Sequence, residues 1–345
     1  MKKRNIINLI KYYTDENDVG FRNEAFEIAR DFDESGDHQL AEYVMALLSN
    51  ANTFVPQTSE FESSFFDKVT VGNESLPLPE LIEQDIIGIL NAVSRNLGIG
   101  KFLFQGAPGT GKTESAKQIA RILGRDMYST NFSAVIDSKL GQTQKNIAAL
   151  FSEINGLAHP EKVIILFDEI DAIALDRTNS NDLREMGRAT SALLKELDRM
   201  DERVVLIATT NLFDHFDKAL VRRFDSVVDF NRYGQDDLLE IAETLLNSFL
   251  TKYKCQGRNV RLFRKIMSLY SPIPYPGELK NTIRTAVAFS NPNDEFDYLK
   301  RLYYSACGGK TMSVQELKDK GFTLREIEVL SGVSKSQAAR ELKES

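Results

Sequence analysis

The segment that most restricts the fold of this chain is a glycine-rich stretch, Gly106 to Thr113, which reads GAPGTGKT. A short apolar run, residues 102–104, precedes it, and a helical pattern over residues 114–123 follows it. Strand, tight turn and helix in this order open an α/β unit. Because Gly109 and Gly111 lack side chains, the backbone can curl until successive N–H groups face one point, a geometry that suits an anion.

This stretch matches the P-loop pattern, in which each residue type has a chemical task. Lys112 would neutralise the β- and γ-phosphates of a nucleotide, and the hydroxyl of Thr113 would bind Mg²⁺. We expect the whole turn to contact nucleotide: Gly106, Ala107, Pro108, Gly109, Thr110, Gly111, Lys112, Thr113 and Glu114. The alternative, an ordinary glycine turn before a helix, is disfavoured by the complete strand–turn–helix context.

A second motif, VIILFDEID over residues 163–171, predicts a buried strand that delivers two acids to one edge of the sheet. Asp168 is positioned to hold Mg²⁺ through water, and Glu169 to polarise an attacking water molecule. Acids after a strand also cap helices, so the catalytic interpretation depends on the P-loop that precedes them.

Alternation of apolar and helical segments predicts the fold class. Apolar runs recur at 163–167 and 204–208 with helical patterns between them, so we expect an α/β fold, a P-loop NTPase parallel sheet with helices on both faces. An α-helical lid and small all-α parts at both ends complete it. The expected domains are an N-terminal helical domain at 1–52 with breaks at Gly20 and Gly36, a linker at 53–75, the α/β nucleotide-binding domain at 76–234, the helical lid at 235–308, and a tail at 311–345.

Together these motifs resemble those of the AAA+ ATPases, over roughly residues 75–305. ATTN, residues 208–211, is similar to the family's sensor 1, which implies that Asn211 orients the attacking water. DKALVRRFD, residues 217–225, resembles the segment whose arginines reach a neighbouring subunit, which makes Arg222 and Arg223 finger candidates. The resemblance implies ATP and Mg²⁺ as ligands and a homo-oligomeric ring, expected to be a hexamer.

Several positions depart from the family pattern. The Pro-Gly pair that commonly separates the arginines is missing, and Gly277 stands where many relatives carry a sensor 2 arginine. Ile241 matches a position that packs on adenine in relatives, and it is as readily interpreted as a core residue. In DSKLGQTQKNI, residues 137–147, Lys139 stands where threading machines carry a pore aromatic, which weakens the case for polypeptide threading.

The RRFD form is most similar to a bacterial group of stand-alone AAA ATPases. Some members are encoded beside a subtilisin-like protease, which makes such a protease a candidate partner.

The tail carries a separate pattern. Residues 321–343 resemble a helix-turn-helix, with a turn at Gly332 and Ser334 as the cap of the second helix. The second helix would present to DNA the side chains of Lys335, Ser336, Gln337 and Arg340. Two features weaken this interpretation: Glu328 stands where such motifs usually carry a small residue, and the charges of residues 310–345 nearly balance. A small bundle that docks a protein or stabilises an oligomer is therefore the open alternative.

Composition adds limits. The chain has 345 residues, a net charge of −7 and only two cysteines, Cys255 and Cys307, so a multidomain cytoplasmic protein without a disulfide framework is expected. No apolar stretch is long enough to cross a membrane. The Asn-Lys-x-Asp pattern that reads guanine is absent, which favours ATP over GTP.

These observations predict an ATPase whose hydrolysis drives a conformational change in an oligomer. Three outputs remain open: remodelling of a protein partner, ATP-controlled binding of DNA through 321–343, and ATP-dependent assembly of a scaffold.

Overall fold

The computed structural model describes residues 3–14, 18–35, 41, 44–45, 63–72, 77–136, 142–174, 182–253 and 257–344. The chain divides into two compact units, Met1–Ser63 and Ser64–Ser345. In the first unit, α1 (Lys3–Thr14) packs beside α2 (Asp18–Glu34), and the Asn8 amide donates to Glu24 at 3.1 Å. Gly20 lies inside α2, so the expected helix break at Gly20 is wrong, whereas Gly36 lies outside the described residues.

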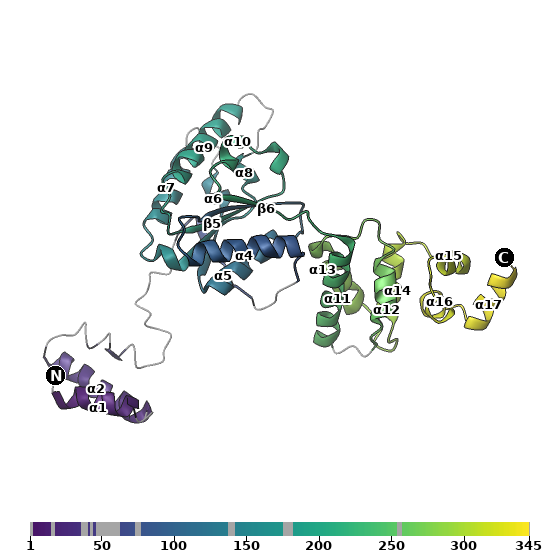
Figure 1. The fold of residues 1–345 in the computed structure, drawn as a ribbon, viewed down its shortest axis with the longest axis horizontal. Helices are drawn as coiled ribbons and strands as arrows, with labels where there is room; N and C mark the ends of the chain where they lie inside the picture. The colour runs from purple at the N-terminus through teal and green to yellow at the C-terminus, as the bar shows by residue number, and fades with distance from the viewer. Residues whose placement is uncertain are drawn as a thin grey trace. The chain divides into compact units, whose positions relative to one another are not determined.

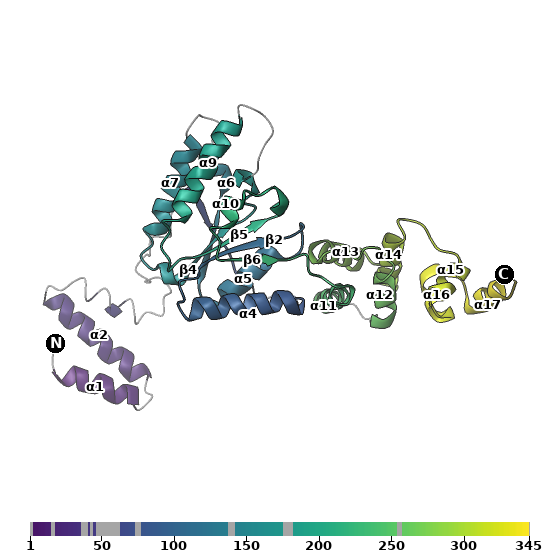
Figure 2. The same cartoon turned by 45° about the horizontal axis from the view of Figure 1, so that its top comes forward.

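The second unit is built on a six-stranded sheet with the order β1-β3-β4-β5-β2-β6 (Figures 1 and 2). The strands are β1 (Phe66–Lys68), β2 (Lys101–Gln105), β3 (Asp126–Thr130), β4 (Val163–Phe167), β5 (Val205–Thr210) and β6 (Ser226–Asp229). All pairings are parallel except that of β1 with β3. The central strands β4 and β5 are buried along their whole length, as their continuous apolar runs predict.

Helices cover both faces of this sheet (Figure 2). On one face, α4 (Glu80–Ser94) and α5 (Lys112–Leu123) pack on alternate strand residues such as Phe102 and Phe104. On the other lie α7 (Gln142–Asn155) and α9 (Asp182–Leu197), with Phe151 edge-on to Phe167 of β4. Short turns complete the unit: α6 (Phe132–Val135), η1 (Pro160–Lys162), α8 (Asp171–Ala174), η2 (Phe213–His215) and α10 (Lys218–Val221). The predicted α/β class with a mostly parallel sheet is confirmed.

Strand β1 lies within the segment that the sequence assigns to a linker. It pairs antiparallel with β3, and an ion pair of 3.1 Å joins Lys68 to Asp126. A three-residue strand whose partner lies far along the chain has no local periodicity that sequence could report.

After the sheet, the chain is helical. The segment that the sequence assigns to a lid contains α11 (Gln235–Lys252), α12 (Val260–Met267), α13 (Pro276–Ala288) and α14 (Asp297–Ala306), and these helices are called the lid below. The tail consists of α15 (Val314–Asp319), α16 (Leu324–Ser331) and α17 (Lys335–Glu344).

Lid and tail share one hydrophobic core, in which Phe263 of α12 and Phe322 of the tail are both fully buried. The Lys265 ammonium joins the two parts, because it donates to Glu326 at 2.7 Å and to the Gly321 carbonyl at 2.8 Å. The tail therefore packs as an extension of the lid.

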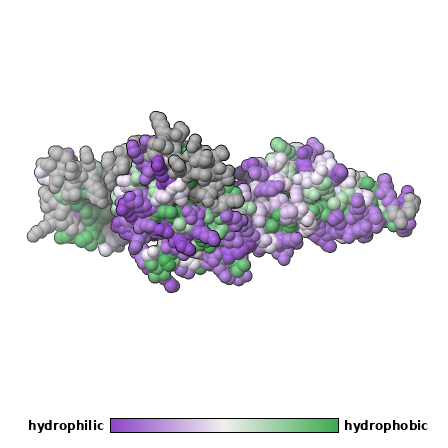
Figure 3. All heavy atoms as spheres, turned by 90° about the horizontal axis from the view of Figure 1, so that it is seen from above, coloured by the Kyte–Doolittle hydropathy of each residue, from purple (hydrophilic) through white to green (hydrophobic). Residues whose placement is uncertain are grey.

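The face seen in Figure 3 is largely hydrophilic, with hydrophobic residues scattered over it. Within the described ranges, no helix combines the length and apolar character needed to span a bilayer.

Candidate functional site

The P-loop connects the end of β2 to the start of α5. Gly109 and Gly111 have φ angles of +77° and +96°, in the left-handed region that favours glycine. Gly111 is the N-cap of α5, so the helix N-terminus and its unpaired N–H groups open at this turn. The glycines thus adopt the turned backbone that the sequence predicts at this point.

Lys112 is 7% exposed, and its ammonium lies at the centre of the site. It donates to the carbonyls of Gly106 at 2.7 Å and Ala107 at 2.9 Å, and to the side-chain oxygen of Asn211 at 2.8 Å. Burial lowers the pKa of Lys112, and the nearby carboxylates, first among them Asp168, oppose that shift. The P-loop cation and the strand-ending asparagine are therefore in direct contact.

The two acids after β4 face the same point. Asp168 accepts from the Thr113 hydroxyl at 3.0 Å and from the Thr209 hydroxyl at 2.7 Å. Glu169 accepts from the Asn211 amide at 3.3 Å. Its φ of +52° is unusual for a residue with a side chain, and such strain clusters at functional sites.

Thr209, Thr210 and Asp171 hold the paired acids and Asn211 in place, and no sequence pattern marks them for this task. The Thr209 hydroxyl accepts from the Glu169 N–H at 2.8 Å, so it holds both acids. Asp171, 8% exposed, accepts from the Thr210 hydroxyl and from the Asn211 N–H, the latter at 2.9 Å. The third acid of DEID thereby fixes the end of β5, where Asn211 stands.

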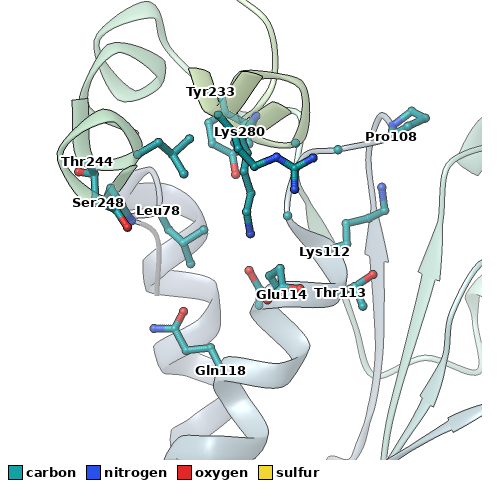
Figure 4. A pocket seen from close by; sticks show the side chains of 18 of the residues that line it. Leu78, Pro108, Lys112, Thr113, Glu114, Gln118, Tyr233, Thr244, Ser248 and Lys280 are labelled. Atoms are coloured by element: carbon teal, nitrogen blue, oxygen red, sulfur yellow. The ribbon is translucent and has the colours of Figure 1, made fainter. Parts of the chain in front are cut away.

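A cavity of about 680 Å³ opens beside the P-loop, between the sheet unit and the lid (Figure 4). Apolar side chains line one part of the cavity: Pro77 and Leu78 from the segment just before α4, and Leu245 and Phe249 from α11. Three cations of the lid also line it: Lys252, Lys280 and Arg284. Figure 4 shows Lys280 extending from the lid toward the start of α5. Sequence reasoning missed these cations because their helices are far from the P-loop in the chain.

Other predicted site residues lie elsewhere. Ile241 is 1% exposed in the lid core, and α11 lines the cavity with its next turns instead. Arg223 forms an ion pair with Asp198 at 3.1 Å. Arg222 is exposed, and its guanidinium makes no hydrogen bond or ion pair with any described residue, although its backbone N–H donates to the Lys218 carbonyl at 3.2 Å. The expected pore residue Lys139 falls outside the described ranges.

Residues 102–232 match the model of the ATPase family associated with various cellular activities (AAA). The chain contains an AAA ATPase domain. The match begins in β2 and ends after β6, so the P-loop, the paired acids, Asn211 and both arginines lie inside the AAA domain.

Known proteins are similar to part of this chain. An uncharacterized AAA family ATPase of Sinorhizobium fredii, y4kL, is 39% identical over 132 residues, which cover 38% of this chain and 39% of that protein. The peroxisomal ATPase PEX6 of Yarrowia lipolytica is 33% identical over 171 residues, covering 48% of this chain and 16% of PEX6. The chain therefore spans well under half the length of these curated relatives.

A solved structure extends the likeness beyond the AAA domain. A chain of the HORMA:CdnC:Trip13 complex of E. coli MS115-1 superposes with a TM-score of 0.56 and 19% identity, covering 72% of this chain and 97% of that chain. At this identity the likeness concerns the fold alone.

Proposed function

We propose that this chain binds ATP with Mg²⁺ and hydrolyses it, and that hydrolysis moves the lid relative to the sheet domain. The observation behind this proposal is one hydrogen-bonded network, in which Lys112, Asn211 and Glu169 are joined through the Thr209 hydroxyl to Asp168 and Thr113. Cation, hydroxyl, two carboxylates and an amide converge beside turned glycine amides, which are the groups that phosphoryl transfer to water requires.

The donor set supports Mg²⁺. Thr113 and Asp168 present a hydroxyl and a carboxylate oxygen within 3.0 Å of each other at the start of α5. Among the described residues there is no cluster of three or more acidic, histidine or cysteine ligands. Mg²⁺ fits such a site because it keeps waters and takes one or two protein oxygens together with substrate phosphates. Bound there, Mg²⁺ would neutralise charge on the phosphates.

The remaining groups divide the catalytic work. Lys112 and the P-loop amides bind phosphate oxygens, and the carboxylate of Glu169 accepts a proton from the attacking water. Asn211 holds that carboxylate on one side and the Lys112 ammonium on the other, at 3.3 and 2.8 Å. General-base assistance of this kind contributes ~10²- to 10⁴-fold in rate.

The cavity supports binding of a whole nucleotide. Its apolar wall of Leu78, Leu245 and Phe249 suits a base, while Lys280 and Arg284 add positive charge for the phosphates. The base is adenine in this proposal. Ile241 supports the apolar wall, because it is buried in the same hydrophobic core as Leu245 and Phe249. ATP and GTP competition against a bound fluorescent ADP analogue tests this choice, and stronger competition by GTP would contradict it.

We further propose a homo-oligomer, a ring most simply of six subunits, in which Arg222 reaches the neighbouring ATP. Its side chain is exposed and makes no hydrogen bond or ion pair within the described residues, whereas the Arg223 side chain is held by Asp198 of its own subunit. An arginine finger supplied in this way contributes ~10³- to 10⁵-fold in rate.

The output that we propose is remodelling of a protein partner in the cytoplasm. A similar solved chain supports a protein partner, because its structure is that of a HORMA:CdnC:Trip13 complex. The N-terminal unit, a separate compact body, offers a place for such a partner to dock. A subtilisin-like protease stays a candidate for that partner.

DNA binding through 321–343 is the second candidate. It is favoured by the exposure of Lys335, Ser336, Gln337 and Arg340 on α17, which follows the Gly332 turn. Glu328 weighs against it, because its carboxylate lies 3.4 Å from the Lys335 ammonium and competes with a phosphate. Loss of binding with rising salt is the expected signature of phosphate contacts.

Affinity purification with Glu169→Gln tests the proposed output. This variant should retain ATP and the partner together, and Glu202→Gln, an exposed acid outside the site, is the matched control. Enrichment of a protein in the presence of ATP supports remodelling, and enrichment of DNA alone supports the second candidate. Retention of neither by an ATP-loaded variant would contradict both.

A further inference from the structure

Two groups outside the P-loop donate hydrogen bonds to its backbone carbonyls. The hydroxyl of Tyr233, on the connection between β6 and α11, donates to the carbonyl of Thr110 at 2.6 Å. The N–H of Gly277, in the first turn of α13, donates to the carbonyl of Gly109 at 2.8 Å. Neither residue belongs to the predicted phosphate site, yet both contact its backbone.

These carbonyls belong to the peptide units whose N–H groups bind phosphate. The carbonyl of Gly109 shares a planar peptide with the N–H of Thr110, and the carbonyl of Thr110 shares one with the N–H of Gly111. In a trans peptide the two groups point in opposite directions. Hydrogen bonds in such a chain polarise one another, so a phosphate on the N–H side strengthens the bond on the carbonyl side.

The contact at Gly277 requires glycine. A Cβ added there would lie 2.8 Å from the Cα of Gly109, a distance that forces the two backbones apart. The place where the family resemblance leads one to expect an arginine is therefore occupied by a residue that lets α13 touch the P-loop directly.

Tyr233 is suited to the same task. Its ring lines the cavity and packs against Tyr275 with ring centroids 5.9 Å apart. Burial raises the pKa of Tyr233, with smaller contributions from Asp237 and Tyr275, so the hydroxyl keeps its proton and remains a donor at neutral pH.

We propose that Tyr233 and Gly277 are positioning residues, which hold two P-loop peptides in the phosphate-binding orientation and transmit phosphate occupancy to the lid. This inference rests on the proposed nucleotide binding and adds the physical link from phosphate to lid movement.

Tyr233→Phe tests the link, because it removes one hydroxyl and keeps the ring. The matched control is Tyr275→Phe, since the Tyr275 hydroxyl makes no hydrogen bond with a described residue and does not line the cavity. Affinity is measured by titration of a fluorescent ADP analogue. Lid response is measured by hydrogen exchange of peptides from Pro276–Ala288 with and without ADP.

Tyr233→Phe should bind ADP roughly 3- to 10-fold more weakly, the net effect of one hydrogen bond, and ADP should protect the lid peptides less. Gly277→Ala should weaken binding further, with a thermal unfolding midpoint close to that of the wild type. Tyr275→Phe should match the wild type in both measurements.

Two results would overturn the inference. Wild-type affinity and wild-type lid protection in both Tyr233→Phe and Gly277→Ala would overturn it alone, while leaving the proposed function intact. A wild-type protein that binds no ADP would overturn the proposed function and this inference with it.

Discussion

Replacement of Asp171 by alanine should disable the site without touching the P-loop. The Asp171 carboxylate is buried and accepts from the Thr210 hydroxyl and from the Asn211 N–H. An unpaired buried donor costs about 1–3 kcal/mol, so two of them should lower the free energy of unfolding by about 2–6 kcal/mol. Asn211, no longer fixed, should shift away from Glu169, and a displacement near 1 Å reduces rate by up to about 100-fold.

Steady-state phosphate release and urea unfolding measure the two effects of Asp171 separately. The turnover number should fall while KM for ATP changes less, because Lys112 loses its contact with Asn211 but keeps those with the Gly106 and Ala107 carbonyls. The turnover number and stability of Asp171→Asn should lie between those of the wild type and Asp171→Ala, since its single carbonyl oxygen has to accept from two donors. Asp214→Ala, an exposed acid nearby, is the control. A folded Asp171→Ala protein whose turnover number stays within about two-fold of wild type would show that Asp171 does not position Asn211 for hydrolysis.

Lys112→Met should abolish binding of a fluorescent ADP analogue, because it removes the buried ammonium that faces the phosphates; retained affinity would exclude Lys112 from the site. Arg222→Ala should stop phosphate release yet recover it when mixed with Glu169→Gln subunits, whereas recovery only with Arg223→Ala would assign the finger to Arg223. Burial raises the pKa of Glu326, but the hydrogen bonds from Lys265 and Thr323 together lower it by more than burial raises it. The pKa of Glu326 therefore lies below its ordinary value. Stability from a lowered pKa is present above the unfolded value and lost as the pH falls. Glu326→Gln should therefore cost about 1–3 kcal/mol at pH 7 in urea unfolding, and the difference should shrink below about pH 4.3; a pH-independent difference would contradict this.

The P-loop, the paired acids and Asn211 could be predicted from sequence because short contiguous motifs fix their local geometry. Glycines that require positive φ, a strand that ends in acids and a strand that ends in asparagine meet at one edge once the strands are parallel. The mostly parallel sheet followed from the same alternation of strands and helices.

The supporting contacts could not be predicted, because they join residues distant in sequence. Asp171 resembles any helix-capping acid until the neighbouring strand brings Thr210 to it. Gly277 has meaning only once α13 touches the P-loop, and Lys265 only once the tail meets the lid. The short strand β1 was assigned to a linker for the same reason, since it forms only by pairing with β3.

The most direct test of the central claim is ATP turnover by the purified full chain and by Glu169→Gln under identical conditions. We expect Mg²⁺-dependent phosphate release by the wild type and a reduction of ~10²- to 10⁴-fold in Glu169→Gln, which still binds ATP. Phosphate release by Glu169→Gln at the wild-type rate, or ATP binding by the wild type without any phosphate release, would contradict it.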